Sequence, residues 1–151
     1  MLLLGALAGA ARVVVNWDVG YVQVDRDGHI HNSLDVSTSI HAHGIFQNGT
    51  NYMDGTAMVT QCGIPPGQNF TYEYEADHAG TFWLHGHDHH QNSDGLRTPL
   101  VVRERKDPYH YEAEYVLSLE DWYQFEFATR LKNSLDPTDF PAAAQLSLCS
   151  V

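Results

Sequence analysis

Hydrophobic and polar positions alternate with a period of two along several short segments of the 151-residue chain. Side chains i and i+2 lie on the same face of a β-strand, so this alternation is typical of strands with one buried face. β-branched and aromatic residues are also frequent in these segments. The alternation predicts a strand at 70–75, and the β-branched and aromatic residues predict one at 13–24. Runs between turn residues predict further strands at 39–46, 81–87, 96–102 and 115–123.

Turn residues separate the predicted strands. Asn48-Gly49 is a strong turn signal after the second segment, and the residues of 25–28, 65–67 and 78–80 favour further turns. Short strands at roughly ten-residue spacing indicate an all-β sandwich or barrel. The last stretch, 132–151, contains two prolines and a run of alanines without a clear period. We predict a poorly ordered tail there.

Charge and length narrow the possible functions. Nineteen acidic side chains against eight basic ones give a formal net charge of −11, which excludes a phosphate-tracking surface and makes nucleic acid an improbable partner. The length suits one domain. Ten histidines favour metal chemistry, because neutral imidazole is the commonest metal ligand.

The N-terminal segment and two short motifs predict an extracellular or cell-surface location. Residues 1–11 are apolar and end in small residues, as in a signal peptide, and are too few to span a membrane. We therefore predict no transmembrane segment. The triplets beginning at Asn48 and Asn69 are N-glycosylation acceptors. Cys62 and Cys149 could form one disulfide, but no sequence feature places them together.

Two His-x-His pairs are the main candidates for chemistry. His41 and His43 form the first pair, and His85 and His87 form the second. Each pair falls in a predicted strand, where both rings would share a face. Two such strands side by side would project four imidazoles toward one point. Nitrogen ligands without a nearby thiolate suit copper or zinc better than calcium or magnesium.

Other polar residues have simpler interpretations. His29 and His31 form a third His-x-His after a predicted turn, so we expect surface side chains. His89 and His90 lie in a polar loop, where solvated or ligand-supporting positions are expected. Asp54 is most simply a turn residue, and its alternative role is a carboxylate that orients a ligand or moves protons.

A zinc hydrolase is a remote alternative. The segment HGHDHH resembles the His-x-His-x-Asp-His motif of the metallo-β-lactamase type. Here Asp88 lies one position early, and His89 stands where the aspartate is needed. That fold also alternates helices with strands, which the present pattern does not predict.

The segments around both pairs resemble the first cupredoxin-like domain of fungal multicopper oxidases, in the branch of iron-transport ferroxidases and laccases. The matching segments lie within 32–102: HNSLDVSTSIHAHGIFQNGT, MDG, TQCGIPPG, GTFWLHGH and DGLRTPLVV. Laccases usually carry tryptophan where this chain has Ala42, and FQNGT with MDG is more similar to the ferroxidases. The resemblance implies an all-β, cupredoxin-like Greek-key sandwich or barrel, incomplete in this chain.

The resemblance also implies a role for each site residue. His41 would bind a type 2 copper, His43, His85 and His87 would bind two type 3 coppers, and Asp54 would help to deliver protons to bound oxygen. A type 1 copper would pass single electrons to this trinuclear cluster, where dioxygen becomes water. Copper suits this reaction because it changes oxidation state and zinc does not. Ferrous iron is the favoured reductant and phenols the alternative, and an iron permease is an expected partner of the complete protein.

The chain departs from the family pattern in three places. The resemblance implies that the other cluster ligands and the type 1 site belong to a last domain, which we expect to be missing from this chain. About two dozen residues, including a strand, are missing near 28–31, and Cys62 matches a cysteine that pairs with a later domain in relatives. The predicted organisation is a signal peptide at 1–11, a first plastocyanin-like domain at 12–114, the start of a second domain at 115–131, and a non-matching tail at 132–151.

Two hypotheses follow. The first is a copper-binding portion of an oxidase, inactive by itself because half of the cluster ligands are elsewhere. The second is a non-catalytic copper-binding fragment or isoform.

Overall fold

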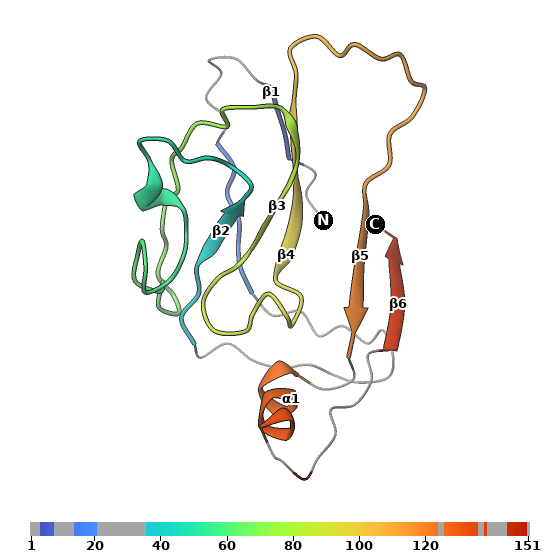
Figure 1. Ribbon diagram of the computed structural model, residues 1–151. Helices are drawn as coiled ribbons and strands as arrows, with labels where there is room; N and C mark the ends of the chain where they lie inside the picture. The colour runs from blue at the N-terminus through green and yellow to red at the C-terminus, as the bar shows by residue number, and fades with distance from the viewer. Residues whose placement is uncertain are drawn as a thin grey trace. The chain divides into compact units, whose positions relative to one another are not determined.

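The computed structural model describes residues 4–7, 14–20, 36–123, 126–135, 138 and 145–150 (Figure 1). Contacts divide the chain into two units. One unit comprises Met1–Asp18 and Asp35–Tyr115, and the other comprises Val19–Leu34 and Val116–Val151. Both predicted histidine pairs belong to the first unit.

The first unit is built on a four-stranded sheet in the order β1-β4-β3-β2 (Figure 1). Its strands are β1 (Leu4–Leu7), β2 (Ile40–His43), β3 (Gly80–Gly86) and β4 (Arg97–Arg103). β3 pairs antiparallel with both β2 and β4, whereas β1 pairs parallel with β4. The strands predicted at 39–46, 81–87 and 96–102 are therefore confirmed.

The register of β2 against β3 decides which side chains face the core. Ala42 lies opposite Leu84, and each is 2% exposed. Successive side chains of a strand point to opposite faces, so this register places His41 and His85, which are also partners, on the other face. The core cluster consists of Ala42, Ile45, Leu84, Leu100 and Val102, with Ile40, Tyr74, Ala76 and Phe82 packed against it.

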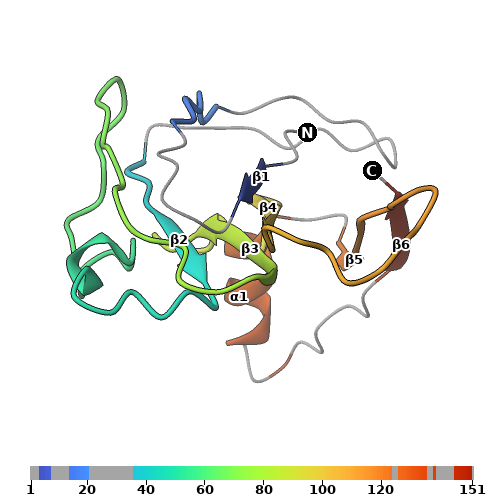
Figure 2. The same ribbon diagram turned by 90° about the horizontal axis from the view of Figure 1, so that it is seen from above.

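The loop that follows β2 covers the outer edge of that strand. It contains the predicted turn, in which Thr50 N–H donates to Gln47 O, and the short 3-10 helix η1 (Asn51–Met53). Figures 1 and 2 show this loop on the side of β2 away from β3. Gly55 packs so closely on β2 that an added Cβ would lie 1.8 Å from Ile40 O. Residue 55 therefore has no room for a side chain against the edge of β2.

The strand predicted at 70–75 does not form, although its alternation persists. Tyr72 and Tyr74 are half-buried, whereas Glu73 between them is exposed. This segment provides a hydrogen-bond acceptor for β2 from a side chain and not from a backbone ladder. Ile40 N–H donates to the Tyr72 hydroxyl over 3.0 Å. The periodicity thus identified the buried face but not the hydrogen-bonding partner.

The strand predicted at 13–24 is also absent over its described part, 14–20. Val14 is 69% exposed, and Trp17 and Val19 are exposed as well. β-branched and aromatic residues favour strands where they pack on a half-buried surface, whereas within the described segment these three side chains remain 37–69% exposed.

The second unit contains a two-stranded antiparallel sheet and a helix (Figure 2). β5 (Leu117–Trp122), which was predicted, pairs with β6 (Gln145–Ser150), and α1 is Phe127–Ser134. The prediction of a poorly ordered tail was wrong for β6. The sequence QLSLCS alternates with period two, a signal outweighed in the prediction by the prolines and alanines before it.

Several predictions fall partly or wholly on residues that are not described. β1 lies within the segment predicted as a signal peptide, and that assignment stays a prediction, as do the boundaries at 114 and 131. The turn at 25–28, the gap near 28–31, His29 and His31 lie outside the described residues. Among the helices that are described, none is long and apolar enough to cross a membrane.

Candidate metal centre

Three imidazoles from β2 and β3 converge on one face of the sheet. Ring nitrogens of His41, His43 and His85 all lie within 4.8 Å of one another. His41 and His85 are direct partners in the ladder, and His43 Nδ1 is 3.2 Å from His85 Nε2. The strand pairing therefore brings together one complete histidine pair and half of the other.

His87 completes the second pair immediately after the end of β3. Its ring centroid lies 5.3 Å from that of His41 and 5.7 Å from that of His85. Its backbone N–H donates to Ser39 O over 3.0 Å. The ring is thus a neighbour of the group, although its nitrogens are not among the three that lie within 4.8 Å of one another.

Hydrogen bonds to backbone carbonyls orient two of the rings. His41 Nδ1–H donates to Asp54 O over 2.7 Å, and His85 Nδ1–H donates to Gly86 O over 3.0 Å. A neutral imidazole that donates through one nitrogen keeps a lone pair on the other, so Nε2 of each ring can bind a metal, which at His85 would replace the contact with His43 Nδ1. The Asp54 carboxylate also approaches this site, with Oδ1 3.2 Å from His41 Nδ1.

Burial favours the neutral form of His85. The residue is 6% exposed, and burial lowers its pKa from the ordinary value of 6.5. The adjacent His41, His43 and His87 lower that pKa further, whereas the hydrogen bond to Gly86 acts in the opposite direction. Metal ligation requires neutral imidazole, so this environment keeps His85 ready to ligate near neutral pH.

Trp83 stacks on two of the imidazoles. Its ring centroid is 4.1 Å from that of His85 and 5.0 Å from that of His43, with interplanar angles of 28° and 30°. Sequence analysis did not identify this residue as part of the site. The signal was present, because Trp83 precedes His85 by two positions in a strand and therefore shares its face.

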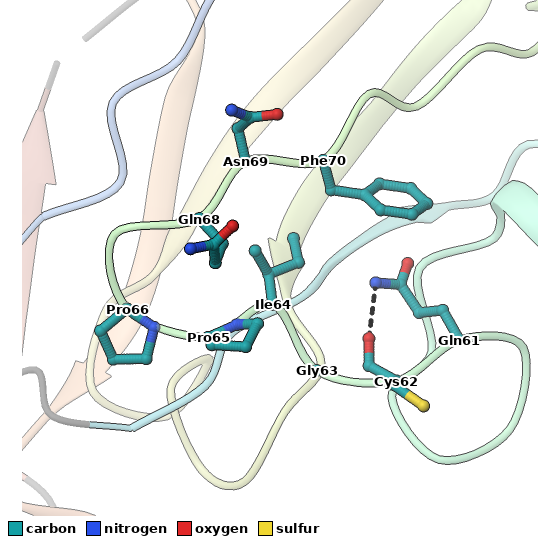
Figure 3. A pocket seen from close by; sticks show the side chains of 9 residues that line it. All are labelled: Gln61, Cys62, Gly63, Ile64, Pro65, Pro66, Gln68, Asn69 and Phe70. Carbon is teal, nitrogen blue, oxygen red and sulfur yellow. Dashed lines mark hydrogen bonds between the residues drawn. The ribbon is translucent and has the colours of Figure 1, made fainter.

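The donor set fits copper or zinc. Its atoms are imidazole nitrogens, and Cys62 is an exposed free thiol in another loop. That loop borders a pocket of about 630 Å³ lined by residues of 61–70 (Figure 3). Its lining offers the Cys62 thiol but no histidine or carboxylate, and among the described residues no group of three metal-ligating side chains lies there.

The HGHDHH segment does not assemble a dinuclear zinc motif. Asp88 is buried, with Oδ2 bonded to Ser37 Oγ and Oδ1 2.7 Å from His89 Nδ1. His90 Nε2 lies 3.8 Å from Asp94 Oδ2. In the part of the chain that is described, the group of three histidines is the one candidate metal cluster, and Asp88 is not a member of it.

Comparison with known proteins identifies the family. Residues 25–107 match the family model described as multicopper oxidase. The chain belongs to the multicopper oxidase family. It is 50% identical over 111 residues to the iron transport multicopper oxidase fetC of Epichloe festucae, covering 72% of this chain and 18% of that protein. It is 46% identical over 111 residues to Laccase-1 of Fomitopsis schrenkii, covering 70% of this chain and 20% of that protein.

The fold agrees with this membership. The crystal structure of Fet3p, a multicopper oxidase that functions in iron import, matches with a TM-score of 0.65 and 37% identity, over 76% of this chain and 22% of that one. The predicted all-β, cupredoxin-like class is confirmed, and the family binds copper. The chain spans about a fifth of the length of these relatives.

Proposed function

We propose that this chain is a copper-binding portion of a multicopper oxidase, in which His41 binds a type 2 copper and His43, His85 and His87 bind two type 3 coppers. The observation that carries the proposal is the convergence of ring nitrogens from β2 and β3 within 4.8 Å, inside the residues matched to the family. The proximity of the His87 ring to His41 and His85 supports its inclusion.

Copper in such a centre supplies stepwise one-electron chemistry that reduces dioxygen to water. The residues of this chain hold and orient its ligands. The carbonyls of Asp54 and Gly86 fix the tautomers of His41 and His85, and Trp83 restricts the rings of His43 and His85 by stacking. We assign the Asp54 carboxylate to proton delivery because Oδ1 lies 3.2 Å from His41 Nδ1 and the side chain is partly exposed.

Ferrous iron is the favoured reductant of the complete protein, and phenols are the alternative. Similarity to fetC and the FQNGT and MDG segments support iron, whereas similarity to Laccase-1 supports phenols. Dioxygen is the co-substrate in either case. An iron permease partner, an extracellular or cell-surface location and glycosylation at Asn48 and Asn69 belong to the same proposal.

The 151-residue chain by itself is expected to bind copper without turnover. Its described residues supply four candidate ligands at one site, and the family resemblance places the remaining ligands elsewhere. Oxygen consumption driven by ferrous iron with the purified chain would contradict this expectation.

Copper titration of the purified chain tests the proposal. We expect saturable binding, and we expect His85→Gln to raise the copper Kd by more than about tenfold, since even residues that support metal ligands contribute 10- to 100-fold. His110→Gln is the matched control, because His110 is exposed in a different loop. Equal affinities of the wild type and the two variants would overturn the proposed site.

A further inference from the structure

A buried carboxylate lies next to the second histidine pair but outside the metal centre. The Asp88 side chain is 9% exposed. Its Oδ2 accepts a hydrogen bond from Ser37 Oγ over 2.5 Å, and its Oδ1 lies 2.7 Å from His89 Nδ1. A buried carboxylate is costly unless it is paired, and here both oxygens have partners. We call Ser37, Asp88 and His89 the Asp88 cluster.

The loop containing Gly63 closes one side of the Asp88 cluster. A Cβ at Gly63 would lie 2.4 Å from Asp88 Oδ2 and 2.7 Å from Ser37 Oγ. This glycine belongs to the loop drawn in Figure 3, and Ile64 after it exchanges two backbone hydrogen bonds with Thr38. The backbone at Gly63 therefore covers one side of the part-buried Ser37–Asp88 bond.

The cluster joins the segments that carry the two histidine pairs. Ser37 precedes His41 by four residues, and Asp88 directly follows His87. Beside the cluster, His87 N–H donates to Ser39 O. These contacts fasten the start of the loop after β3 to the segment before β2.

Gln91 and the backbone of His89 give further evidence of this fastening. Gln91 Nε2 donates to Ser37 O over 2.9 Å, and Gln91 Oε1 accepts from Thr38 Oγ1 over 2.8 Å. His89 has φ of +53°, a left-handed conformation that a non-glycine residue keeps only where its surroundings hold it.

We propose that Asp88 is a positioning residue for the copper centre: through its bond to Ser37 it fixes His87 against 37–39, so that the His87 ring faces His41 and His85. Asp88 is not itself a ligand. The inference rests on the proposed function, and it explains why an acidic residue is buried beside His87.

The test uses Ser37→Ala, Asp88→Ala and the double variant of the 151-residue chain. We expect each single change to raise the copper Kd about tenfold, as for other residues that orient metal ligands. Both changes remove the Ser37–Asp88 bond, and Asp88→Ala also removes the contact with His89, so the double variant should behave like Asp88→Ala. The electron paramagnetic resonance spectrum of bound Cu(II) should change in the same three variants.

Ser39→Ala is the matched control. Ser39 is fully buried and its hydroxyl has no hydrogen-bond partner among the described residues, so the same substitution two positions away removes an unbonded hydroxyl. The substitution keeps the Ser39 backbone carbonyl that accepts from His87 N–H, so we expect its copper Kd and spectrum to match those of the wild type. If Asp88→Ala does not fold, the difference in copper Kd between Ser37→Ala and Ser39→Ala tests the positioning role.

Hydrogen exchange of the copper-free chain provides an independent readout. The His87 amide should exchange faster in Ser37→Ala than in the wild type, whereas amides of β3 should not change. If the wild type binds copper, and Ser37→Ala and Asp88→Ala have the same copper Kd and spectrum as the wild type, the positioning role is overturned. A wild-type chain that binds no copper would contradict the proposed function, and the His87 exchange rate would then decide separately whether the cluster holds this residue.

Discussion

The loops after β2 and after β3 each support one histidine pair, but they do so by different means. The loop after β2 uses backbone: Gly55 packs on Ile40, and the Asp54 carbonyl accepts from His41. The loop after β3 uses side chains, chiefly those of Asp88 and Gln91, which bond to Ser37 and Thr38. The first arrangement should therefore be most sensitive to added atoms, and the second to removed atoms.

The largest effect on stability is expected from a substitution at the contact between Gly55 and the backbone of Ile40. Gly55→Ala would place a Cβ 1.8 Å from Ile40 O at φ of +82°, so we expect it to lower the free energy of unfolding by about 3 kcal/mol or more. Gly49→Ala has a similar φ of +79° and open space around it, and should lower it by about 1 kcal/mol. Denaturant unfolding measures both, and equal losses would contradict a close backbone contact.

A smaller effect on stability is expected when the side-chain hydrogen bonds of Gln91 are removed. Gln91→Ala removes two hydrogen bonds of a residue that is 5% exposed, leaving Thr38 Oγ1 and Ser37 O without this partner. We expect a loss of about 2 kcal/mol in the free energy of unfolding. Gln68→Ala is the control, because Gln68 is exposed. If Gln91→Ala and Gln68→Ala cost the same, the loop after β3 is not held by these bonds.

Tyr72 combines the two arrangements, because its side chain bonds to the backbone at the edge of β2. Tyr72→Phe removes the acceptor of Ile40 N–H and should lower the free energy of unfolding by about 1 kcal/mol. Tyr74→Phe is matched, since burial raises the pKa of both phenols but no hydrogen bond to the Tyr74 hydroxyl is present among the described residues. A larger loss for Tyr74→Phe in chemical unfolding would refute the role of the Tyr72 hydroxyl.

The smallest effect concerns pH. Burial lowers the pKa of His85 below 6.5, so the unfolded copper-free chain binds this proton more readily than the folded chain. The contribution to stability is complete above pH 6.5 and is lost as the pH falls through the folded pKa. We expect the wild type to lose more unfolding free energy than His85→Gln between pH 8 and pH 5. Parallel pH profiles would contradict the lowered pKa.

The sequence predicted the parts of the molecule that depend on local composition and turn residues. β2, β3, β4 and β5 follow from short runs of apolar and β-branched residues between turn signals, and the strand prediction placed the rings of His41, His43 and His85 on one face. It could not predict contacts between distant segments. The Ile40–Tyr72 bond replaces a backbone ladder, and Trp83 became part of the site only once its ring was seen against two histidines.

The tail and the polar loop illustrate the same limit. The backbone of β6 pairs with that of β5 across more than twenty residues of sequence, and composition does not reveal such a pairing. His89 was expected to be solvated or to support a ligand indirectly, and it pairs with Asp88 while its ring stays largely exposed. Asp88 itself was considered only as a misplaced zinc ligand, because burial cannot be deduced from a polar loop sequence.

X-ray absorption of the copper-loaded chain tests the central claim most directly, namely that strands β2 and β3 bring the two histidine pairs to one metal centre. We expect nitrogen ligation with the multiple-scattering pattern of three or more imidazoles, reduced in His43→Gln and unchanged in His110→Gln. A spectrum dominated by oxygen ligands or by a single imidazole, and unaffected by His43→Gln, would contradict it.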